Sequence, residues 1–105
     1  MKVEIVARHC ELDDALREKA ESIVDRWPRY DSTASHARLA FDVQGSSHTV
    51  DAQVWRDRHE PVAAKGEGGD FRAALDEVDE RIRRILRKDK QKRSKHQTEP
   101  ADFPG

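Results

Sequence analysis

The sequence predicts a two-layer α+β domain with the element order βαβββα, in which two helices cover one face of a four-stranded mixed sheet. Four segments alternate apolar and polar residues with the period of two that is typical of strands. Two others repeat apolar residues at helical spacing along a single stripe, so each helix has one face to bury. The chain has 105 residues, 35% of them hydrophobic and 39% charged, which allows one thin core and no second domain.

The first strand is predicted over residues 2–7, where Lys2 and Glu4 alternate with Val3 and Ile5. A helix separates it from the next strand, so these two strands should be parallel and joined by a right-handed crossover. The later strands follow one another through short turns and should form an antiparallel meander. The face of the sheet away from the helices is expected to remain in water.

The first helix is predicted to begin after Asp13, which can cap its N-terminus. Pro28 should end the helix because proline lacks an amide hydrogen and disfavours helical geometry in the residue before it. Between these two positions the apolar residues recur every three or four positions. The stripe consists of Leu12, Leu16, Ala20, Ile23, Val24 and Trp27.

Three strands follow the first helix. We expect irregular chain over residues 30–35, a turn over residues 45–47 and a polar hairpin loop over residues 56–60. In each strand, polar residues alternate with those predicted to face the core. The core-facing residues are Ala37, Leu39, Phe41 and Val43, then Val50, Ala52 and Val54, then Val62, Ala64 and Gly66.

The second helix is the most regular element of the sequence. Two glycines and Asp70 provide a turn and an N-cap, after which apolar residues keep helical spacing without a gap. Residues 96–105 contain two prolines and show no periodicity, so we expect a folded domain over residues 1–95 and a disordered tail over residues 96–105. The stripe of this helix consists of Phe71, Ala74, Leu75, Val78, Ile82, Ile85 and Leu86.

Charge is strongly segregated, although the formal net charge is only −1. Residues 1–80 carry 11 basic and 18 acidic residues, whereas residues 81–95 carry nine basic residues and one acid. Such a block attracts polyanions even in a nearly neutral protein. Complementing the helix dipole and forming i,i+4 pairs explain part of the pattern, but not nine cations in 15 residues.

The basic residues predict a nucleic-acid interface. At about 100° per residue, five cations of the second helix fall on one flank of its apolar stripe, and Arg83 and Arg87 fall on the other. Three cations of the first helix occupy the equivalent flank of that helix. We therefore expect the two helices to line a positive groove that binds phosphates through Lys19, Arg26, Arg29, Arg81, Arg84, Lys88, Lys92 and Lys95.

Other functional classes find little support in the residues. Cys10 is the only cysteine, so no internal disulfide forms, and the five histidines lack the spacing of a metal site. No phosphate-binding glycine loop or catalytic set is visible, so we expect neither an enzyme nor a cofactor. No signal peptide or long apolar run occurs, which predicts a cytoplasmic protein. Trp55, on the wet face of its strand, either stacks on a base or packs against the neighbouring strand.

Several short motifs resemble a known family. They are Arg8-His9, residues 14–18, Arg29-Tyr30, residues 69–76 and residues 84–88. As an ordered set they are similar to the ribosome hibernation promoting factor and ribosome-associated inhibitor family, in the short form of sigma-54 modulation proteins. The resemblance extends over about residues 2–95, and its fold plan is related to double-stranded RNA-binding domains.

The resemblance implies a stress-response protein that contacts ribosomal RNA in the tRNA and messenger channel of the small ribosomal subunit and inhibits translation by steric occlusion. The matching contact positions are Arg26 and Arg29 in the first helix and Arg81, Arg84, Lys88 and Lys92 in the second. It also implies a monomer away from the ribosome, with no membrane and no small-molecule substrate. The residues alone leave two alternatives, a module for another structured RNA and a regulator that binds proteins.

Overall fold

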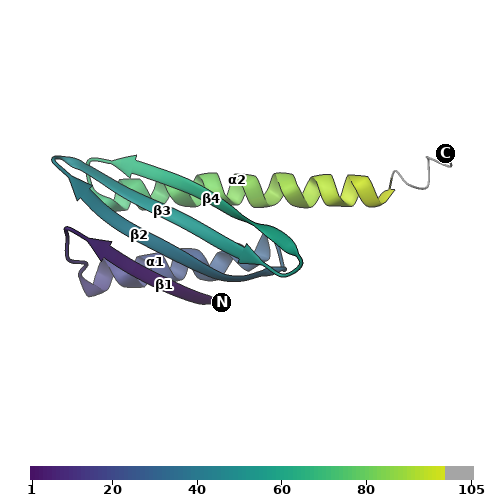
Figure 1. Cartoon of the computed structure of the whole chain (residues 1–105), viewed down its shortest axis with the longest axis horizontal. Helices are drawn as coiled ribbons and strands as arrows, with labels where there is room; N and C mark the ends of the chain where they lie inside the picture. The colour runs from purple at the N-terminus through teal and green to yellow at the C-terminus, as the bar shows by residue number, and fades with distance from the viewer. Residues whose placement is uncertain (99–105) are drawn as a thin grey trace.

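The computed structural model describes the backbone of residues 1–98 and the side chains of residues 1–89. The strands lie in the order β1-β2-β3-β4, with β1 parallel to β2 and the other pairs antiparallel. The predicted βαβββα fold is therefore confirmed. Its elements are β1 (Lys2–Arg8), α1 (Asp14–Arg26), the 3-10 turn η1 (Trp27–Arg29), β2 (Ala34–Gln44), β3 (Ser47–Arg56), β4 (His59–Gly68) and α2 (Phe71–Thr98) (Figure 1).

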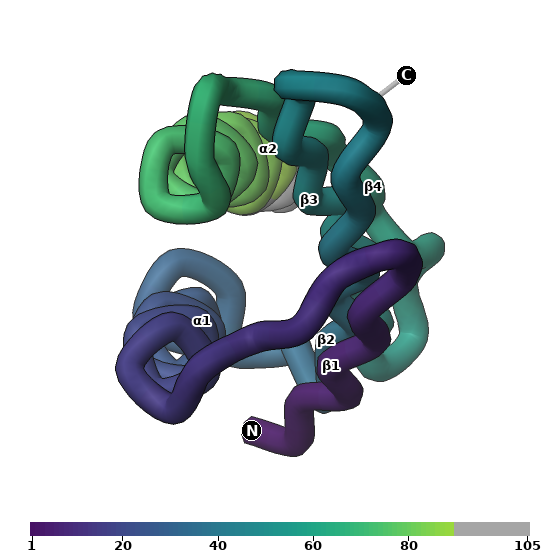
Figure 2. The backbone as a smooth tube through the Cα atoms, turned by 90° about the vertical axis from the view of Figure 1, so that its left-hand side faces the viewer, coloured from purple at the N-terminus to yellow at the C-terminus, as the bar shows by residue number. Residues whose placement is uncertain are grey.

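Both helices lie on the same side of the sheet, and the opposite side carries no element (Figure 2). α2 packs mainly on β4 and β3, whereas α1 lies over the β1 side. The core between these layers uses alternate residues of the strands and one stripe of each helix, as predicted, but Val43 and Ile85, which were also predicted to face the core, are not among its buried residues. Its buried apolar side chains are Ala20, Ile23, Val24, Trp27, Ala34, Ala37, Leu39, Phe41, Val50, Ala52, Val54, Ala74, Leu75, Val78, Ile82 and Leu86.

Helix α1 begins and ends where the sequence predicted. The backbone N–H of Leu16 donates to the Asp13 carboxylate at 2.8 Å, which caps the N-terminus. At the other end Pro28 stops the α-helix, but the chain continues through one tighter turn in which the Tyr30 N–H donates to the Trp27 carbonyl. The buried Trp27 indole donates to Asp79 of α2 at 2.8 Å, so the turn that follows α1 is joined to the N-terminal third of α2.

Two turns are tighter than predicted. The prediction of a polar loop over residues 56–60 is wrong, because β3 extends to Arg56 and only Asp57 and Arg58 separate it from β4. Arg58 has a φ of 64°, within the positive range that tight hairpin turns use. The turn before β3 is also shorter by one residue, and Gly45 adopts a φ of 62° there without steric cost.

Helix α2 is much longer than the strands it covers. Its 28 residues span about 42 Å at 1.5 Å per residue, whereas the ten residues of β4 span about 33 Å. Its C-terminal part accordingly continues past the end of the sheet (Figure 1). The helix reaches Thr98, three residues beyond the boundary predicted for the folded domain. The rest of the predicted tail, residues 99–105, lies outside the described residues.

Gly66 sets how closely α2 approaches the sheet. It is a buried residue of β4, and an added Cβ would lie 2.1 Å from the Ala74 carbonyl oxygen and 2.7 Å from the Val78 nitrogen. Both obstacles belong to the helix backbone, so relief would require α2 to move as a whole. The observed packing of α2 on β4 therefore requires glycine, which has no side chain, at this position.

We expect Gly66→Ala to lower the free energy of unfolding by at least about 2 kcal/mol, since overpacking against backbone cannot be relieved by a rotamer change. Gly69→Ala is the matched control, because its added Cβ meets nothing within 4 Å. Urea unfolding followed by tryptophan fluorescence measures both variants. Equal midpoints for the two variants would contradict the close-approach argument.

Candidate nucleic-acid interface

A positive surface lies on the solvent side of α2. Four cations and one acid, spaced by three and four residues, surround a shallow depression of about 330 Å³. The side chain of Arg84 is 66% exposed, which leaves its guanidinium accessible to a ligand. We call this surface the α2 crest, and its residues are Glu80, Arg83, Arg84, Arg87 and Lys88.

Acids one turn earlier orient the arginines of α2. Arg84 binds Glu80 at 2.7 Å, and the Nε atom of Arg83 lies 3.3 Å from Asp79. The exposed Arg84–Glu80 pair contributes only a few tenths of a kcal/mol, so a phosphate can replace that carboxylate at little cost. Asp79, by contrast, is only 16% exposed and also accepts the Trp27 hydrogen bond, so it holds Arg83 more firmly.

The flank of α2 that faces α1 has mixed charge. Lys19 of α1 binds Asp76 of α2 at 3.1 Å, and Asp79 accepts the hydrogen bond from Trp27. Farther along this flank, the Arg87 guanidinium lies 4.9 Å from the centre of the Tyr30 ring, a cation–π contact. Two acids thus occupy the part of the interhelical space where the sequence predicted only cations.

The predicted groove is wrong in one respect. Arg81 donates to the Lys65 carbonyl oxygen of β4 at 2.5 Å, so it lies on the flank of α2 turned away from α1. Lys88, seven residues later, shares that flank by helical periodicity. Arg83 and Arg87, which sequence reasoning had placed outside the site, lie on the flank of α2 that meets the end of α1, next to Asp79 and Tyr30. Lys92 and Lys95 lie on a part of α2 whose side chains are outside the described residues, and they stay predictions.

Arg26 and Arg29 lie at the end of α1 that contacts α2. Arg26 is the last residue of the α-helix, and Arg29 closes the 3-10 turn that follows Pro28. Both are exposed, and within the described part of the chain neither forms an ion pair. Arg29 directly precedes Tyr30, the residue that contacts Arg87, so the turn brings positive charge to the α2 crest.

A buried ion cluster fixes the far end of this surface. The Arg56 side chain is 5% exposed and binds both Asp31, which is 1% exposed, and Asp89 of α2. Its Nε also donates to the Glu60 carbonyl at 2.9 Å. The cluster joins the end of β3, the chain before β2 and the helix one residue after Lys88. Sequence reasoning missed it because an isolated arginine in a polar stretch resembles a loop residue.

Among the described residues, no group of side chains indicates metal binding or catalysis as clearly as the α2 crest indicates anion binding. No group of three His, Cys, Asp or Glu side chains among them is arranged to hold a metal ion. Burial raises the pKa of the Cys10 thiol, which opposes formation of the reactive thiolate. No helix in the described part of the chain is both long and apolar enough to cross a membrane.

Comparison with known proteins gives a consistent result. The sequence model described as Sigma 54 modulation protein / S30EA ribosomal protein matches residues 3–94. The Protein Y N-terminal domain of Thermus thermophilus superimposes with a TM-score of 0.76 at 24% identity, covering 84% of this chain and 98% of that one. A ribosomal subunit interface protein from Coxiella burnetii gives 0.80 at 22% identity, covering 87% and 99%. No curated protein matches significantly. The two structures share the fold of this chain.

We expect Arg56→Leu to destabilise the protein by about 3–5 kcal/mol, because Asp31 then keeps a buried charge without its guanidinium partner. Hydrogen exchange should also accelerate at the amides of α2 around Asp89. Arg58→Leu, the same change at an exposed neighbouring position, should cost less than about 0.5 kcal/mol. Equal stability of the two variants in urea unfolding would show that the cluster contributes nothing.

Proposed function

Because the chain belongs to the Sigma 54 modulation protein / S30EA ribosomal protein family, we propose that it binds the small ribosomal subunit through ribosomal RNA and inhibits translation by steric occlusion. Membership of this family supports association with the ribosome. The finer proposal is that the domain occupies the channel used by tRNA and messenger RNA and keeps the ribosome idle. Occlusion of this kind needs affinity and shape but no bond chemistry, so no catalytic residue is required.

The α2 crest is the observation that supports RNA binding most directly. It places four cations on one exposed surface within nine residues of helix. Each contact between such a cation and a phosphate releases condensed counterions, which makes binding favourable and strongly dependent on salt. A rigid helix also keeps the spacing of these cations fixed, so little conformational entropy is lost on binding.

The other predicted residues contribute unequally in this proposal. Arg26 and Arg29 extend the positive surface from the end of α1. Lys19 binds Asp76 between the helices and Arg81 binds the Lys65 carbonyl of β4, so both lie away from the α2 crest and should contribute less to RNA contacts. Lys92 and Lys95 remain candidates for contacts farther along α2.

The outward side of α1 argues against a symmetrical RNA surface over both helices. Its exposed stripe, at spacings of three and four residues, is acidic and consists of Asp14, Glu18, Glu21 and Asp25. Phosphates would be repelled there, so RNA should approach from the α2 side.

Competition between small subunits and generic duplex RNA for the labelled protein separates the proposal from a module for other structured RNAs. Ribosome binding that survives a large excess of duplex is expected.

We expect Arg84→Gln combined with Lys88→Gln to reduce co-sedimentation with small subunits. If both cations contact phosphates, the slope of log affinity against log salt should fall by about 1.4–1.8, or 0.7–0.9 per contact. Arg17→Gln combined with Arg72→Gln removes the same charge from exposed helix positions outside the crest and should change little. An unchanged salt slope in the crest variant would exclude the crest as the RNA contact.

We also expect the wild-type chain to inhibit translation of a reporter messenger RNA by purified ribosomes. The crest variant should inhibit only at concentrations raised in proportion to its loss of affinity, because occlusion depends on occupancy alone. Adding the protein before or after initiation distinguishes a block of the empty channel from a block of elongation. Full inhibition by a variant that no longer sediments with ribosomes would contradict the occlusion mechanism.

A further inference from the structure

The side of the sheet opposite the helices, which we call the open sheet face, forms a second organised surface. Strand register places its outward residues in rows that cross the sheet. One row contains Arg38, Gln53 and Ala63, and the next contains Ala40, Asp51 and Lys65. Two alanines among longer side chains leave a hollow in the middle of the face.

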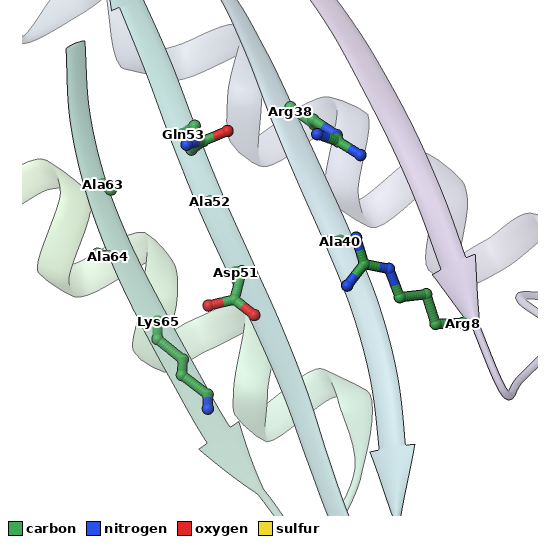
Figure 3. Close-up of a pocket in the computed structure, with 9 residues that line it drawn as sticks. All are labelled: Arg8, Arg38, Ala40, Asp51, Ala52, Gln53, Ala63, Ala64 and Lys65. Atoms are coloured by element: carbon green, nitrogen blue, oxygen red, sulfur yellow. The ribbon is translucent and has the colours of Figure 1, made fainter.

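This hollow is a depression of about 480 Å³ with a positive rim (Figure 3). Arg8 extends from β1 across β2 to the side of Ala40, while Lys65 stands on β4. With Arg38, three cations and one acid, Asp51, line the hollow. Its charge therefore complements an anionic ligand, although the whole protein is nearly neutral.

Arg38 retains donor capacity for such a ligand. Its Nε atom lies 3.5 Å from Glu4, is buried, and makes no hydrogen bond to any described residue. A guanidinium has five N–H donors, and a phosphate accepts two of them at once in a fixed planar geometry. The Arg38 side chain as a whole is 39% exposed, so the ion pair holds it against the sheet while donors other than the buried Nε can reach a ligand.

An aromatic pair lies next to this hollow. His36 and Trp55 face each other across β2 and β3, with ring centres 4.6 Å apart and planes 4° from parallel. They stand two residues along the strands from Arg38 and Gln53, a separation of about 7 Å. His36 is exposed and Trp55 is half-buried, so the stack is open to solvent. Stacked rings beside cations form the combination that binds unpaired nucleotides.

We propose that the open sheet face binds a short segment of single-stranded RNA. One base extends the stack of His36 and Trp55, and the adjoining phosphates bind Arg38, Arg8 and Lys65. The Asp51 carboxylate and the Gln53 amide offer hydrogen bonds to the edge of a second base over the alanine floor. The inference rests on the proposed function, since the ribosome supplies the strand, and it gives the protein an RNA contact on each of its two sides.

The test uses the whole chain and fluorescein-labelled hexaadenylate RNA. Binding should lower the fluorescence of Trp55, whereas the buried Trp27 provides a constant background. Arg38→Gln combined with Lys65→Gln should reduce the salt slope by about 1.4, or 0.7 per phosphate contact on a single strand. Trp55→Thr should weaken binding about fivefold or more, because stacking is lost.

Three controls separate this inference from the proposed function. Trp55→Phe keeps a stacking ring, so it should bind with nearly wild-type affinity in anisotropy while losing the fluorescence change. Arg84→Gln combined with Lys88→Gln should bind the oligonucleotide normally but sediment poorly with ribosomes. Arg17→Gln combined with Arg72→Gln should change neither measurement. No binding of hexaadenylate, or binding sensitive only to the α2 crest, overturns the inference even when wild-type protein sediments with ribosomes.

Discussion

The rotation of α2 about its own axis is the constraint on which the rest of the structure depends. Three contacts fix it. Gly66 lets the helix backbone press against β4, Asp79 accepts the Trp27 indole hydrogen, and Asp89 binds the buried Arg56 guanidinium. Because these contacts are spread along α2 from Ala74 to Asp89, the helix cannot roll without breaking at least one of them. This rotation determines which cations of α2 face solvent, which face α1 and which face β4.

Periodicity was sufficient to predict the fold. The alternation in four segments and the two apolar stripes specify which faces are buried, and burial of those faces allows few arrangements of six elements. Capping by Asp13 and Asp70 was also predictable, because each residue directly precedes a stretch with helical periodicity. In the structure each carboxylate accepts a backbone N–H at 2.8 Å. These features depend on local sequence, which a single chain reveals in full.

The neighbours of each helix flank were not predictable in the same way. A helical wheel places Arg83 on one side of the apolar stripe and Arg81 on the other, but it does not show which side meets α1. That depends on where the helix crosses the sheet, and the close approach at Gly66 contributes to it. Arg56 was missed for a related reason. Its partners, Asp31 and Asp89, are 25 and 33 residues distant in sequence, so no local pattern connects them.

The acids that precede the arginines of α2 have a consequence for selectivity. A lone phosphate approaching Arg84 must exchange places with Glu80, which leaves little net gain. A surface that presents several phosphates in the right arrangement would displace this carboxylate and gain the attraction of Arg87 and Lys88 as well. If the α2 crest binds RNA as proposed, this pairing of Arg84 with Glu80 favours surfaces that present several phosphates together over isolated anions.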